Sequence, residues 1–478
     1  MATTVNLKKI LDLKRWEMIS PAPVATVAGA TITNCRHVKQ LALFNQAVGA
    51  QYLYNPSEDG WITLPSGAMA GTVANGAVGA AHMFSTGATI GAASLTATGG
   101  TTTTLITNQT LARDLRGFSI HILSGPGTGD VRTIASNTVG ANATITVSSA
   151  FSATPTASTA YRLITPRWYL LNPGVLAAGQ FKVYDYATNT WQSLSTTGLP
   201  SVVGTSGSLV STPSWLDSGF LQFATGTATS GTATTLVNSA KTWTASQWVN
   251  YQIRIVSGTG AGQIRTITAN DATSVTVATW TTNPDATSVY SIEGNDDFLY
   301  YMGSGAVTLY RYQISTNTWS TLSPVAARAG APSTGTSGNW VYGVTDSAWT
   351  SESTIKNGNR IYSFRGGAVG TLDYYDIAAN TWVSGITYSP ANETFTTGSK
   401  YAYLTDAIYI QKDAQGRWFK YNLITSEMEG WNTLLYPNST AIDGSTAWEV
   451  VYTDGATKIY YIYMTLNSLS ISLRQMVI

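Results

Sequence analysis

The sequence has few of the residue types from which catalytic and metal sites are built. It contains one cysteine, Cys35, and three histidines among 478 residues, so no internal disulfide can form and a Cys/His metal site is strongly disfavoured. His37 and His82 show no ligand spacing, and we interpret His121 as an exposed strand position. The sequence therefore predicts no catalytic residue, no metal site and no cofactor.

Charged residues are also scarce. Lys, Arg, Asp and Glu make up 11% of the chain, and the formal net charge is +1, whereas an average soluble domain is roughly 25% charged. Such a chain has no overall field to attract nucleic acid or an anionic membrane. A long apolar run that could form a membrane-spanning helix is missing, and the start of the chain does not resemble a signal peptide. We expect synthesis in a cytoplasm, with no nucleic acid and no membrane as partner.

Glycine, threonine, serine and alanine make up much of the remainder. The chain has 44 glycines, 15 tryptophans and 26 tyrosines. Threonine is stiff at χ1 and glycine gains much entropy on unfolding, so both disfavour helices, whereas turn-rich sheets accommodate them. With 44% hydrophobic residues, the chain can still bury a large core. The composition predicts an all-β protein.

One pattern recurs along the chain: a tyrosine in an alternating strand, a short turn, and a tryptophan seven residues after the tyrosine. The four complete copies pair Tyr54 with Trp61, Tyr184 with Trp191, Tyr312 with Trp319, and Tyr375 with Trp382. A fifth copy has Met428 seven residues after Tyr421. The spacing predicts a β-hairpin, because Asn and Gly in the turn tolerate positive φ. Leucine follows three residues after the first three tryptophans, and Gly385 takes that place in the fourth copy.

This signature resembles the second half of a kelch repeat. The steps between successive tyrosines are 130, 128, 63 and 46 residues, and kelch units run about 50 residues. The resemblance implies an all-β, kelch-like β-propeller of about 5–7 blades. The double glycine that opens many kelch blades appears only at Gly366-Gly367, which leaves the blade number open. A final hairpin near the C-terminus is expected to share the last blade with an N-terminal strand.

An inserted repeat explains the two long steps. Residues 95–164 and 225–293 match each other, and removing them leaves steps of about 60 residues, close to one kelch unit. Each copy has a glycine loop followed by an Arg-Thr-Ile strand. The loop residues are Gly125, Gly127, Gly129 and Arg132 in the first copy, and Gly258, Gly260, Gly262 and Arg265 in the second. A phosphate-binding loop needs a helix after its glycines. Because a β-branched strand follows instead, we interpret both loops as turns and both arginines as donors to backbone carbonyls or to a neighbouring chain.

These repeats divide the chain into six parts. The predicted domains are an N-terminal arm at 1–23, a first part of the propeller at 24–94, an inserted β-module at 95–164, a propeller blade at 165–224, a second inserted β-module at 225–293, and the remaining blades with ring closure at 294–478. Within the arm, residues 5–18 show the apolar spacing of an amphipathic helix. Such an arm is expected to dock on a neighbouring molecule.

The inserted module is similar to small β-domains that recur in tail and accessory proteins of tailed bacteriophages. The similarity rests on the glycine loop, the Arg-Thr-Ile strand and a closing pair of proline and tyrosine. It implies a structural, non-enzymatic protein of the tail, neck or collar region that assembles as a homo-oligomer. Its partners would be other virion proteins and copies of itself. Its location would be the virion, after synthesis in the host bacterial cytoplasm.

Two other functions stay open at this point. A host-surface glycan-binding protein, such as an adhesin or receptor-binding protein, is the main alternative. Trp and Tyr are common at binding interfaces, and Trp243, Trp248 and Trp280 of the second module could face a partner. An enzyme is the third hypothesis. Kelch-type copper radical oxidases need a histidine pair beside a Cys–Tyr crosslink, and sialidases need a Ser-x-Asp-x-Gly-x-x-Trp turn. The chain has neither pattern. Paired carboxylates for glycoside hydrolysis stay open, but we interpret Asp296-Asp297 and the pair Asp373 and Asp376 as turn and hairpin residues, and we expect no enzyme.

Overall fold

The structure of the protein is a computed structural model. The described residues are 16–19, 23, 31–35, 40–44, 51–55, 58–65, 77–83, 94–172, 174–175, 179–200, 202–203, 207–211, 222–294, 297–303, 307–330, 340–343, 360–365, 370–388, 395, 400–404, 407–412, 417–423, 425–431, 442–451, 458–466 and 472–477. Most of the predicted N-terminal arm lies outside them. Every regular element in the described part of the chain is a β-strand, which confirms the all-β prediction. That part contains no helix long and apolar enough to cross a membrane.

Six antiparallel sheets of four strands each contain most of the described strands. Sheet 1 has β2 (Thr31–Cys35), β3 (Gln40–Phe44), β4 (Gln51–Asn55) and β5 (Gly60–Thr63), and sheet 2 has β6 (Val78–His82), β13 (Arg167–Leu171), β15 (Phe181–Asp185) and β16 (Thr190–Ser193). Sheet 3 has β18 (Ser208–Ser211), β26 (Phe298–Met302), β27 (Leu309–Gln313) and β28 (Thr318–Thr321), and sheet 4 has β29 (Trp340–Gly343), β30 (Arg360–Phe364), β31 (Thr371–Asp376) and β32 (Thr381–Thr387). Sheet 5 has β33 (Lys400–Leu404), β34 (Ala407–Lys412), β35 (Arg417–Asn422) and β36 (Met428–Trp431), and sheet 6 has β37 (Ile442–Val451), β38 (Lys458–Leu466), β39 (Ser472–Val477) and β1 (Trp16–Ile19). A short pairing of β14 (Gly174–Val175) with β17 (Val202–Val203) stands apart from these sheets.

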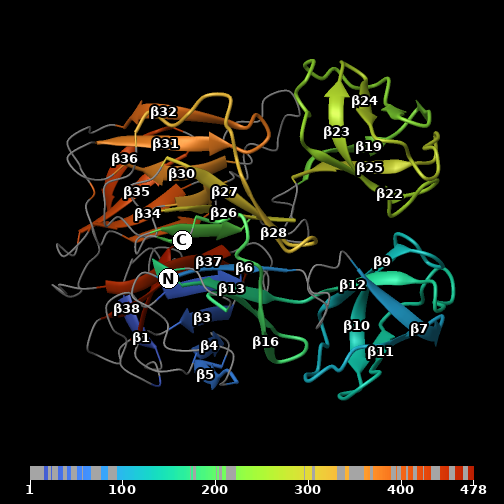
Figure 1. The fold of residues 1–478 in the computed structure, drawn as a ribbon, viewed down its shortest axis with the longest axis horizontal. Helices are drawn as coiled ribbons and strands as arrows, with labels where there is room; N and C mark the ends of the chain where they lie inside the picture. Colours follow the sequence, from blue (N-terminus) through green and yellow to red (C-terminus); the bar gives the residue numbers. More distant parts are fainter. Residues whose placement is uncertain are drawn as a thin grey trace, which may run out of the picture.

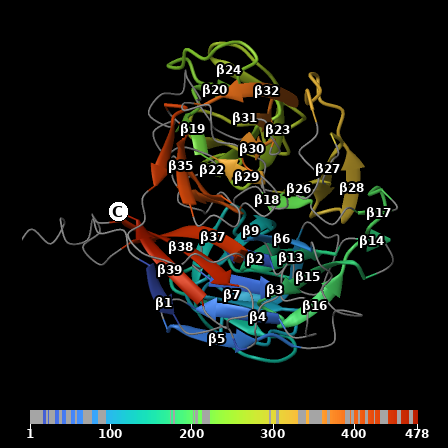
Figure 2. The same cartoon turned by 90° about the vertical axis from the view of Figure 1, so that its left-hand side faces the viewer.

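The first strands of the six sheets form a ring. β2 contacts β6, β6 contacts β18, and the series continues through β29 and β33 to β37, which contacts β2 again. Figure 2 looks onto this ring, with β2, β6 and β18 near its centre and β5, β16 and β28 toward the rim. Antiparallel sheets arranged radially around a common centre are the architecture of a β-propeller. The fold is therefore propeller-like.

The N-terminal strand completes the last sheet. β1 pairs antiparallel with β39, so sheet 6 contains strands from both ends of the chain. Figure 2 shows β1 beside β39, close to the C-terminus. Residues 16–18 are therefore strand, and their part of the predicted helix at 5–18 is wrong, because pairing with β39 satisfies their backbone groups. The rest of that helix lies outside the described residues.

The first inserted repeat, called module 1 below, is a closed six-stranded barrel. Its strands are β7 (Leu95–Thr101), β8 (Thr104–Thr107), β9 (Ser119–Ser124), β10 (Val131–Asn137), β11 (Thr144–Val147) and β12 (Ala160–Ile164). β7 pairs with β12 near its start and with β8 near its end, which closes the barrel. Inward side chains such as Leu105, Ile120 and Tyr161 fill the interior.

The second inserted repeat, called module 2, repeats this strand order with one interruption. Its strands are β19 (Gln222–Thr227), β20 (Ser230–Gly231), β21 (Thr235–Val237), β22 (Gln252–Ser257), β23 (Ile264–Asn270), β24 (Ser274–Val277) and β25 (Val289–Glu293). β19 pairs with β25 and β20 pairs with β21, so these two strands together take the place of β7. β19 begins at Gln222, ahead of the predicted module start at residue 225.

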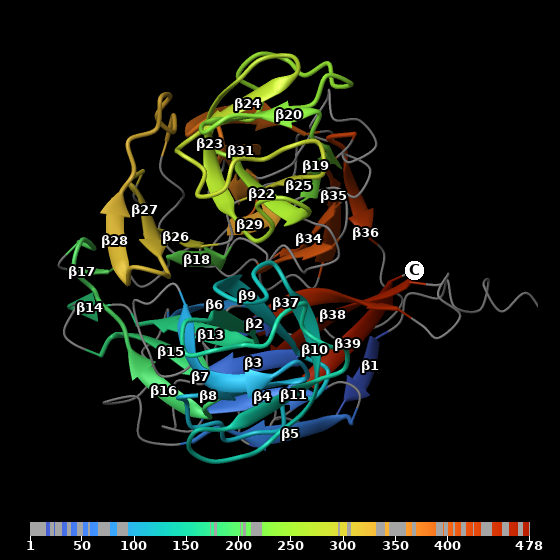
Figure 3. The ribbon, with the colours of Figure 1, turned by 90° about the vertical axis from the view of Figure 1, so that its right-hand side faces the viewer.

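Both modules lie on one side of the ring. Module 1 follows β6 in sheet 2 and module 2 follows β18 in sheet 3, so each interrupts the connection between a first and a second strand. Figure 1 shows the two modules beside the stacked sheets, and Figure 3 shows them in front of the ring. The turns between third and fourth strands open to the same side, because antiparallel strands alternate in direction. We call this side the module face.

Candidate functional site

The tyrosine of each repeat copy closes its own hairpin turn through its hydroxyl. Tyr184 donates to Asn189 Oδ1 at 2.7 Å. The same bond joins Tyr312 to Asn317 at 2.7 Å, Tyr375 to Asn380 at 2.7 Å, and Tyr54 to Asp59 at 2.6 Å. The acceptor residues have positive φ, from 45° at Asp59 to 54° at Asn189, a conformation in which Asn and Asp are enriched. The repeat thus includes a contact between residues five apart that the Tyr–Trp spacing alone does not reveal.

The tryptophan lies directly opposite the tyrosine on the returning strand. Tyr184 pairs with Trp191 and Tyr312 pairs with Trp319 in the strand register. The ring centroids of the four copies are 5.0 Å apart for Tyr54 and Trp61, 5.5 Å for Tyr184 and Trp191, 5.1 Å for Tyr312 and Trp319, and 5.5 Å for Tyr375 and Trp382. Burial raises the pKa of Tyr184 to about 12. The signature residues therefore close turns and pack between strands.

The turn asparagine also connects neighbouring sheets. Ser195, which follows β16 of sheet 2, donates its backbone N–H to Asn317 Oδ1 in sheet 3 at 2.9 Å. Trp319 Nε1 donates to the carbonyl of Ser195 at 3.0 Å. One sheet further along, Asn380 Nδ2 of sheet 4 donates to the carbonyl of Ser323 at 3.1 Å. The signature thus ties sheets 3 and 4 to the sheets that precede them.

In the fourth copy Gly385 replaces the leucine that follows the tryptophan by three residues, and the structure gives the reason. The register between β31 and β32 shifts between Leu372 and Tyr374, which marks a β-bulge. Gly385 lies at this bulge with a φ of 77°, and its backbone N–H donates to Asp373 Oδ1 at 2.8 Å. A leucine would be strained in this conformation, whereas glycine adopts it readily.

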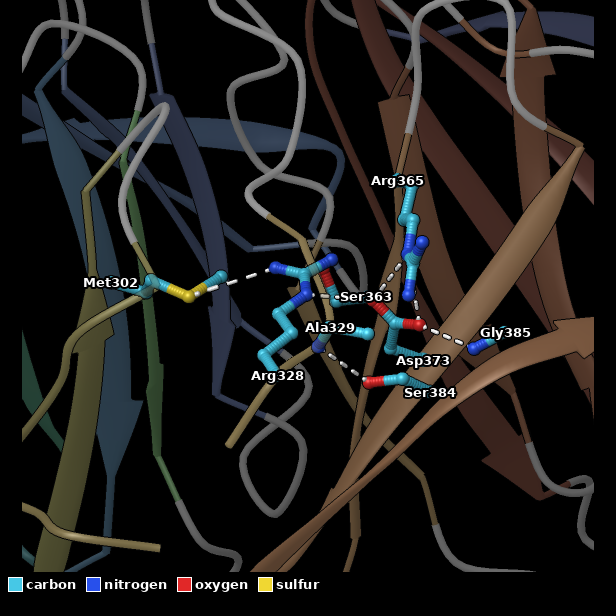
Figure 4. Close-up of polar contacts among 8 residues, drawn as sticks. All are labelled: Met302, Arg328, Ala329, Ser363, Arg365, Asp373, Ser384 and Gly385. Atoms are coloured by element: carbon cyan, nitrogen blue, oxygen red, sulfur yellow. Dashed lines mark hydrogen bonds and ion pairs between the residues drawn. The ribbon is translucent and has the colours of Figure 1, made fainter. Parts of the chain in front are cut away.

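Asp373 is the centre of a buried charged cluster that joins sheets 3 and 4 (Figure 4). Arg328 Nε donates to Asp373 Oδ2 at 2.7 Å, and Arg365 Nε donates to the same oxygen at 3.0 Å. Arg328 also contacts Ser363 Oγ of β30 at 3.0 Å and Met302 Sδ of β26 at 3.6 Å. Burial is the largest influence on the Arg328 pKa and lowers it, while the Asp373 charge opposes that change. The cluster is a cross-link between sheets.

The glycine loops of the two modules are tight turns between strands. Their φ values run from 78° at Gly258 to 89° at Gly129. All six loop glycines have positive φ: Gly125, Gly127, Gly129, Gly258, Gly260 and Gly262. In module 1 the backbone N–H of Asp130 donates to the carbonyl of Gly127 at 2.9 Å. Strands β10 and β23 follow the loops, so neither loop has the helix that a phosphate-binding loop requires.

Arg132 and Arg265 donate mainly to backbone carbonyls. Arg132 Nε donates to the carbonyl of Ala150 at 2.8 Å, and Arg265 Nε donates to the carbonyl of Thr279 at 3.1 Å. Each also donates to the carbonyl of the residue before it. Arg132 additionally pairs with Asp130 at 2.6 Å. Both side chains hold the loop that follows β11 or β24 against their own barrel.

Module 1 is attached to the ring at a repeat turn. The backbone N–H of Ala112 donates to the carbonyl of Ala187 at 2.9 Å. Arg113 Nη2 donates to Asn189 Oδ1 at 2.6 Å and to the hydroxyl of Tyr184 at 2.9 Å. These acceptors lie at the turn between β15 and β16. Module 1 is thus attached to sheet 2, the sheet that it interrupts.

Module 2 is attached at the matching turn of a different sheet. Asn250 Nδ2 donates to the carbonyl of Ala378 at 2.7 Å, and Ala378 packs into the hydrophobic core of module 2. Ala378 stands in the Tyr375–Trp382 repeat where Ala187 stands in the Tyr184–Trp191 repeat. This turn belongs to sheet 4, whereas module 2 interrupts sheet 3.

His121 is fully buried, so its interpretation as an exposed position is wrong. It lies opposite Arg162 in the pairing of β9 with β12. Burial lowers the His121 pKa well below its usual value, and the positive charges of Arg162 and of Arg254 in module 2 lower it further. Strand alternation correctly places His121 on the outside of its barrel. Strand alternation cannot show that module 2 lies against that side of the barrel.

The three tryptophans of module 2 are inside the protein, so the prediction that they face a partner is wrong. Trp248 is fully buried, and Trp243 and Trp280 are 4% and 3% exposed. The Trp248 ring lies 5.4 Å from that of Tyr251, and the Trp243 ring lies 6.3 Å from that of Tyr290. These residues lie outside the repeat signature because they form the core of a separate barrel.

The described residues contain no group of three or more His, Cys, Asp or Glu side chains placed to hold a metal ion. Cys35 is buried, and its Sγ atom lies 3.3 Å from Met83 Sδ. His82 is buried at the end of β6. His37 lies outside the described residues.

Comparisons with known proteins show likeness in overall arrangement alone. No family model and no curated protein matches the sequence. Among solved structures, the chain is similar to a streptogramin B lyase at 9% identity, with 97% of each chain covered and a TM-score of 0.35. It is also similar to a virginiamycin B lyase from Staphylococcus aureus at 7% identity, with 97% of this chain and 100% of that chain covered and a TM-score of 0.37. A mitotic checkpoint complex structure shows 9% identity, 99% and 97% coverage, and a TM-score of 0.34. Likeness at this level assigns no activity, and the fold assignment rests on the sheets themselves.

Proposed function

We propose that this chain is a non-enzymatic structural component of a tailed bacteriophage virion, in the tail, neck or collar region, where it assembles as a homo-oligomer. In this proposal the six described sheets are the blades of a kelch-like propeller, and modules 1 and 2 are homologous β-domains inserted at successive blades. The partners are other virion proteins and copies of the chain itself. The protein is made in the host bacterial cytoplasm and resides in the virion.

The observation that carries this proposal is how the distinctive side chains of the repeat are used. The tyrosines, asparagines and tryptophans of the signature bond to one another and to the preceding sheet, as Asn317 does with Ser195. Arg328, on the segment that leads from sheet 3 to sheet 4, pairs with Asp373 of sheet 4, with both side chains fully buried, and contacts Met302 of sheet 3. A ring stiffened in this way is suited to a scaffold that must keep its shape in a particle.

The duplicated modules support the same proposal. Their sequences are similar to β-domains of phage tail and accessory proteins, and they place two barrels side by side on one face of the ring. Arg113 and Asn250 attach them to repeat turns through side-chain hydrogen bonds. This arrangement presents a surface on which other copies or other virion proteins could pack.

The glycan-binding alternative has less support from the described residues. Its candidate tryptophans in module 2 form a barrel core. The large hydrophobic side chains that are most exposed in the described part are five valines and one isoleucine rather than aromatic residues. Sugar sites favour exposed aromatic rings, so we assign the virion role first.

Immunogold electron microscopy of intact particles tests the proposal. Antibodies raised against the purified chain are applied to particles of the phage that encodes it and, as a control, to particles made without the gene. Label around the neck or along the tail is the expected result. Label confined to fibre tips would favour the glycan-binding alternative, and particles without any label would overturn the virion assignment.

A further inference from the structure

Modules 1 and 2 touch each other through equivalent residues. A Cβ atom on Gly129 would lie 3.0 Å from Ala261 Cβ and from Gly262 N, and a Cβ atom on Gly262 would lie 2.7 Å from Gly129 N and from Thr128 Cγ2. Gly129 and Gly262 are the last glycines of the two loops, and Thr128 and Ala261 are the residues that precede them. The two barrels therefore meet loop against loop, in a nearly symmetric pair.

Four polar side chains on the outer faces of the two barrels are buried. His121 and Arg162 of module 1 are 0% and 7% exposed, and Arg254 and Glu293 of module 2 are 4% and 2% exposed. Arg162 lies opposite His121 on β12, while the residue opposite His121 on β10 is the uncharged Val131. The positive charge of Arg254, on β22 of module 2, also lowers the His121 pKa. The imidazole thus faces positive charge both from its own barrel and from the neighbouring one.

Glu293 on β25 pairs with Arg254. Its Oε1 atom accepts from Arg254 Nη2 at 2.6 Å and from Arg254 Nε at 3.1 Å. Protonation of His121 would place a positive charge where water is excluded and near Arg162 and Arg254, which is unfavourable both by desolvation and by repulsion.

We propose that the two modules form a clasp over the module face that is closed while His121 is neutral and opens when His121 is protonated. The closed clasp connects sheet 2, where module 1 is attached at Ala187, to sheet 4, where module 2 is attached at Ala378. It does so across sheet 3. The clasp lies within one chain, so it does not depend on the proposed place of the protein in a virion.

The direction of the pH effect follows from the burial of His121. Its pKa in the closed clasp lies well below the usual value because of burial, with Arg162 and Arg254 adding to the effect. In the open clasp an exposed histidine titrates at about 6.5. The open state therefore binds the proton more readily. Each pH unit below about 6.5 shifts the ratio of closed to open clasp by up to about tenfold, until the closed-state pKa is reached.

Distances between spin labels on the two modules test this proposal. Ser148→Cys and Ala278→Cys place labels at exposed, equivalent positions after β11 and β24, in a chain that also carries Cys35→Ala to remove the native thiol. We expect one short distance at about pH 7.5 and a growing population of longer distances at about pH 5. An unchanged distance distribution at the lower pH would overturn the proposal.

Two substitutions at His121 connect the opening to this side chain. His121→Gln stays neutral and is expected to keep the short distance at both pH values. His121→Lys carries a permanent charge and is expected to favour the longer distances at both, with circular dichroism as the check on folding. If the His121→Gln chain opens in acid as the parent does, another group is responsible and the proposal is wrong. This result is decisive even when His121→Lys does not fold.

Discussion

Modules 1 and 2 share one strand order, except that β19 and β20 together replace β7, yet they are attached to the ring through different residues. Gly117 and Asn250 occupy the same place, with φ values of 87° and 69°. Their backbone N–H groups donate to the carbonyls of Ile134 and Ile267, each at 2.9 Å. Only Asn250 has a side chain that reaches a repeat turn. Module 1 reaches its turn with Arg113 instead.

The two modules are also attached to different sheets, although each is attached at the same position of the repeat. Ala187 in sheet 2 and Ala378 in sheet 4 hold the same position in their repeats, and each carbonyl accepts a hydrogen bond from a module, Ala187 from the backbone N–H of Ala112 and Ala378 from Asn250 Nδ2. Module 1 is thus tied to the sheet that it interrupts, and module 2 to the following sheet. The comparison teaches that a few residues on one loop make the attachment, while the strand order is common to both modules.

The largest effect is expected from Glu293→Ala, which removes a carboxylate that only module 2 has, since Ile164 holds the matching place in module 1. The variant leaves Arg254 buried without the carboxylate that balances its charge, and we expect a loss of about 3–5 kcal/mol in the free energy of unfolding. Urea denaturation measures the loss. The double variant Arg254→Met, Glu293→Met should recover most of it, and a double variant as unstable as the single one would contradict the charge argument.

A smaller effect is expected from giving module 2 the core residue of module 1. Trp248 and Leu115 are equivalent, since their backbone N–H groups both donate to an asparagine side chain, Asn270 and Asn137, at 2.7 Å. Trp248→Leu leaves a cavity and should cost about 2 kcal/mol. The reverse change, Leu115→Trp, should cost about 1–3 kcal/mol by overpacking. Scanning calorimetry measures both, and a Trp248→Leu chain as stable as the parent would show that the two cores are interchangeable.

Removing the hydroxyl of a signature tyrosine should cost more stability at the turn that carries module 1 than at another repeat turn. The Tyr184 hydroxyl donates to Asn189 and accepts from Arg113, whereas the Tyr375 hydroxyl donates to Asn380. At about 1 kcal/mol for each hydrogen bond, Tyr184→Phe should cost about 2 kcal/mol and Tyr375→Phe about 1 kcal/mol. Guanidinium denaturation of the two variants makes the comparison. Equal losses would mean that the Arg113 bond adds no stability.

The smallest effect is expected from exchanging Asn250 and Gly117, which hold the same place in the two modules. Asn250→Gly removes the bond to Ala378 and should cost about 1 kcal/mol, with faster hydrogen exchange at the turn between β31 and β32. Gly117→Asn is the matched control. No atom lies within 4 Å of a Cβ at Gly117, and asparagine tolerates its φ, so the change should stay within about 0.5 kcal/mol. Faster exchange at that turn in the control would contradict the account.

Much of the fold could be predicted because its signals are local. Tyr184 and Trp191 face each other across one hairpin, so their spacing is visible in a short stretch of sequence. The turn at Asn189 requires a residue that tolerates positive φ, and this requirement restricts the residue type at a single position of the sequence. The matching modules were visible for the same reason, since a repeated stretch needs no knowledge of long-range contacts.

The remaining features depend on contacts between distant parts of the chain. The apolar spacing at 5–18 suggests a helix, but the pairing of β1 with β39 determines the structure of residues 16–18. Arg328 and Asp373 are 45 residues apart, and nothing in either neighbourhood marks them as partners. His121 is buried although strand alternation places it outside its barrel, because alternation gives the side of a strand and not what covers that side.

Quantitative mass spectrometry of purified particles tests the central claim, that this propeller-like chain is a built-in part of a virion, most directly. The account predicts that the chain is present at a constant whole-number ratio to the major tail protein and that this ratio survives a high-salt wash. Absence of the chain from washed particles, or a ratio that varies between preparations, would contradict the claim.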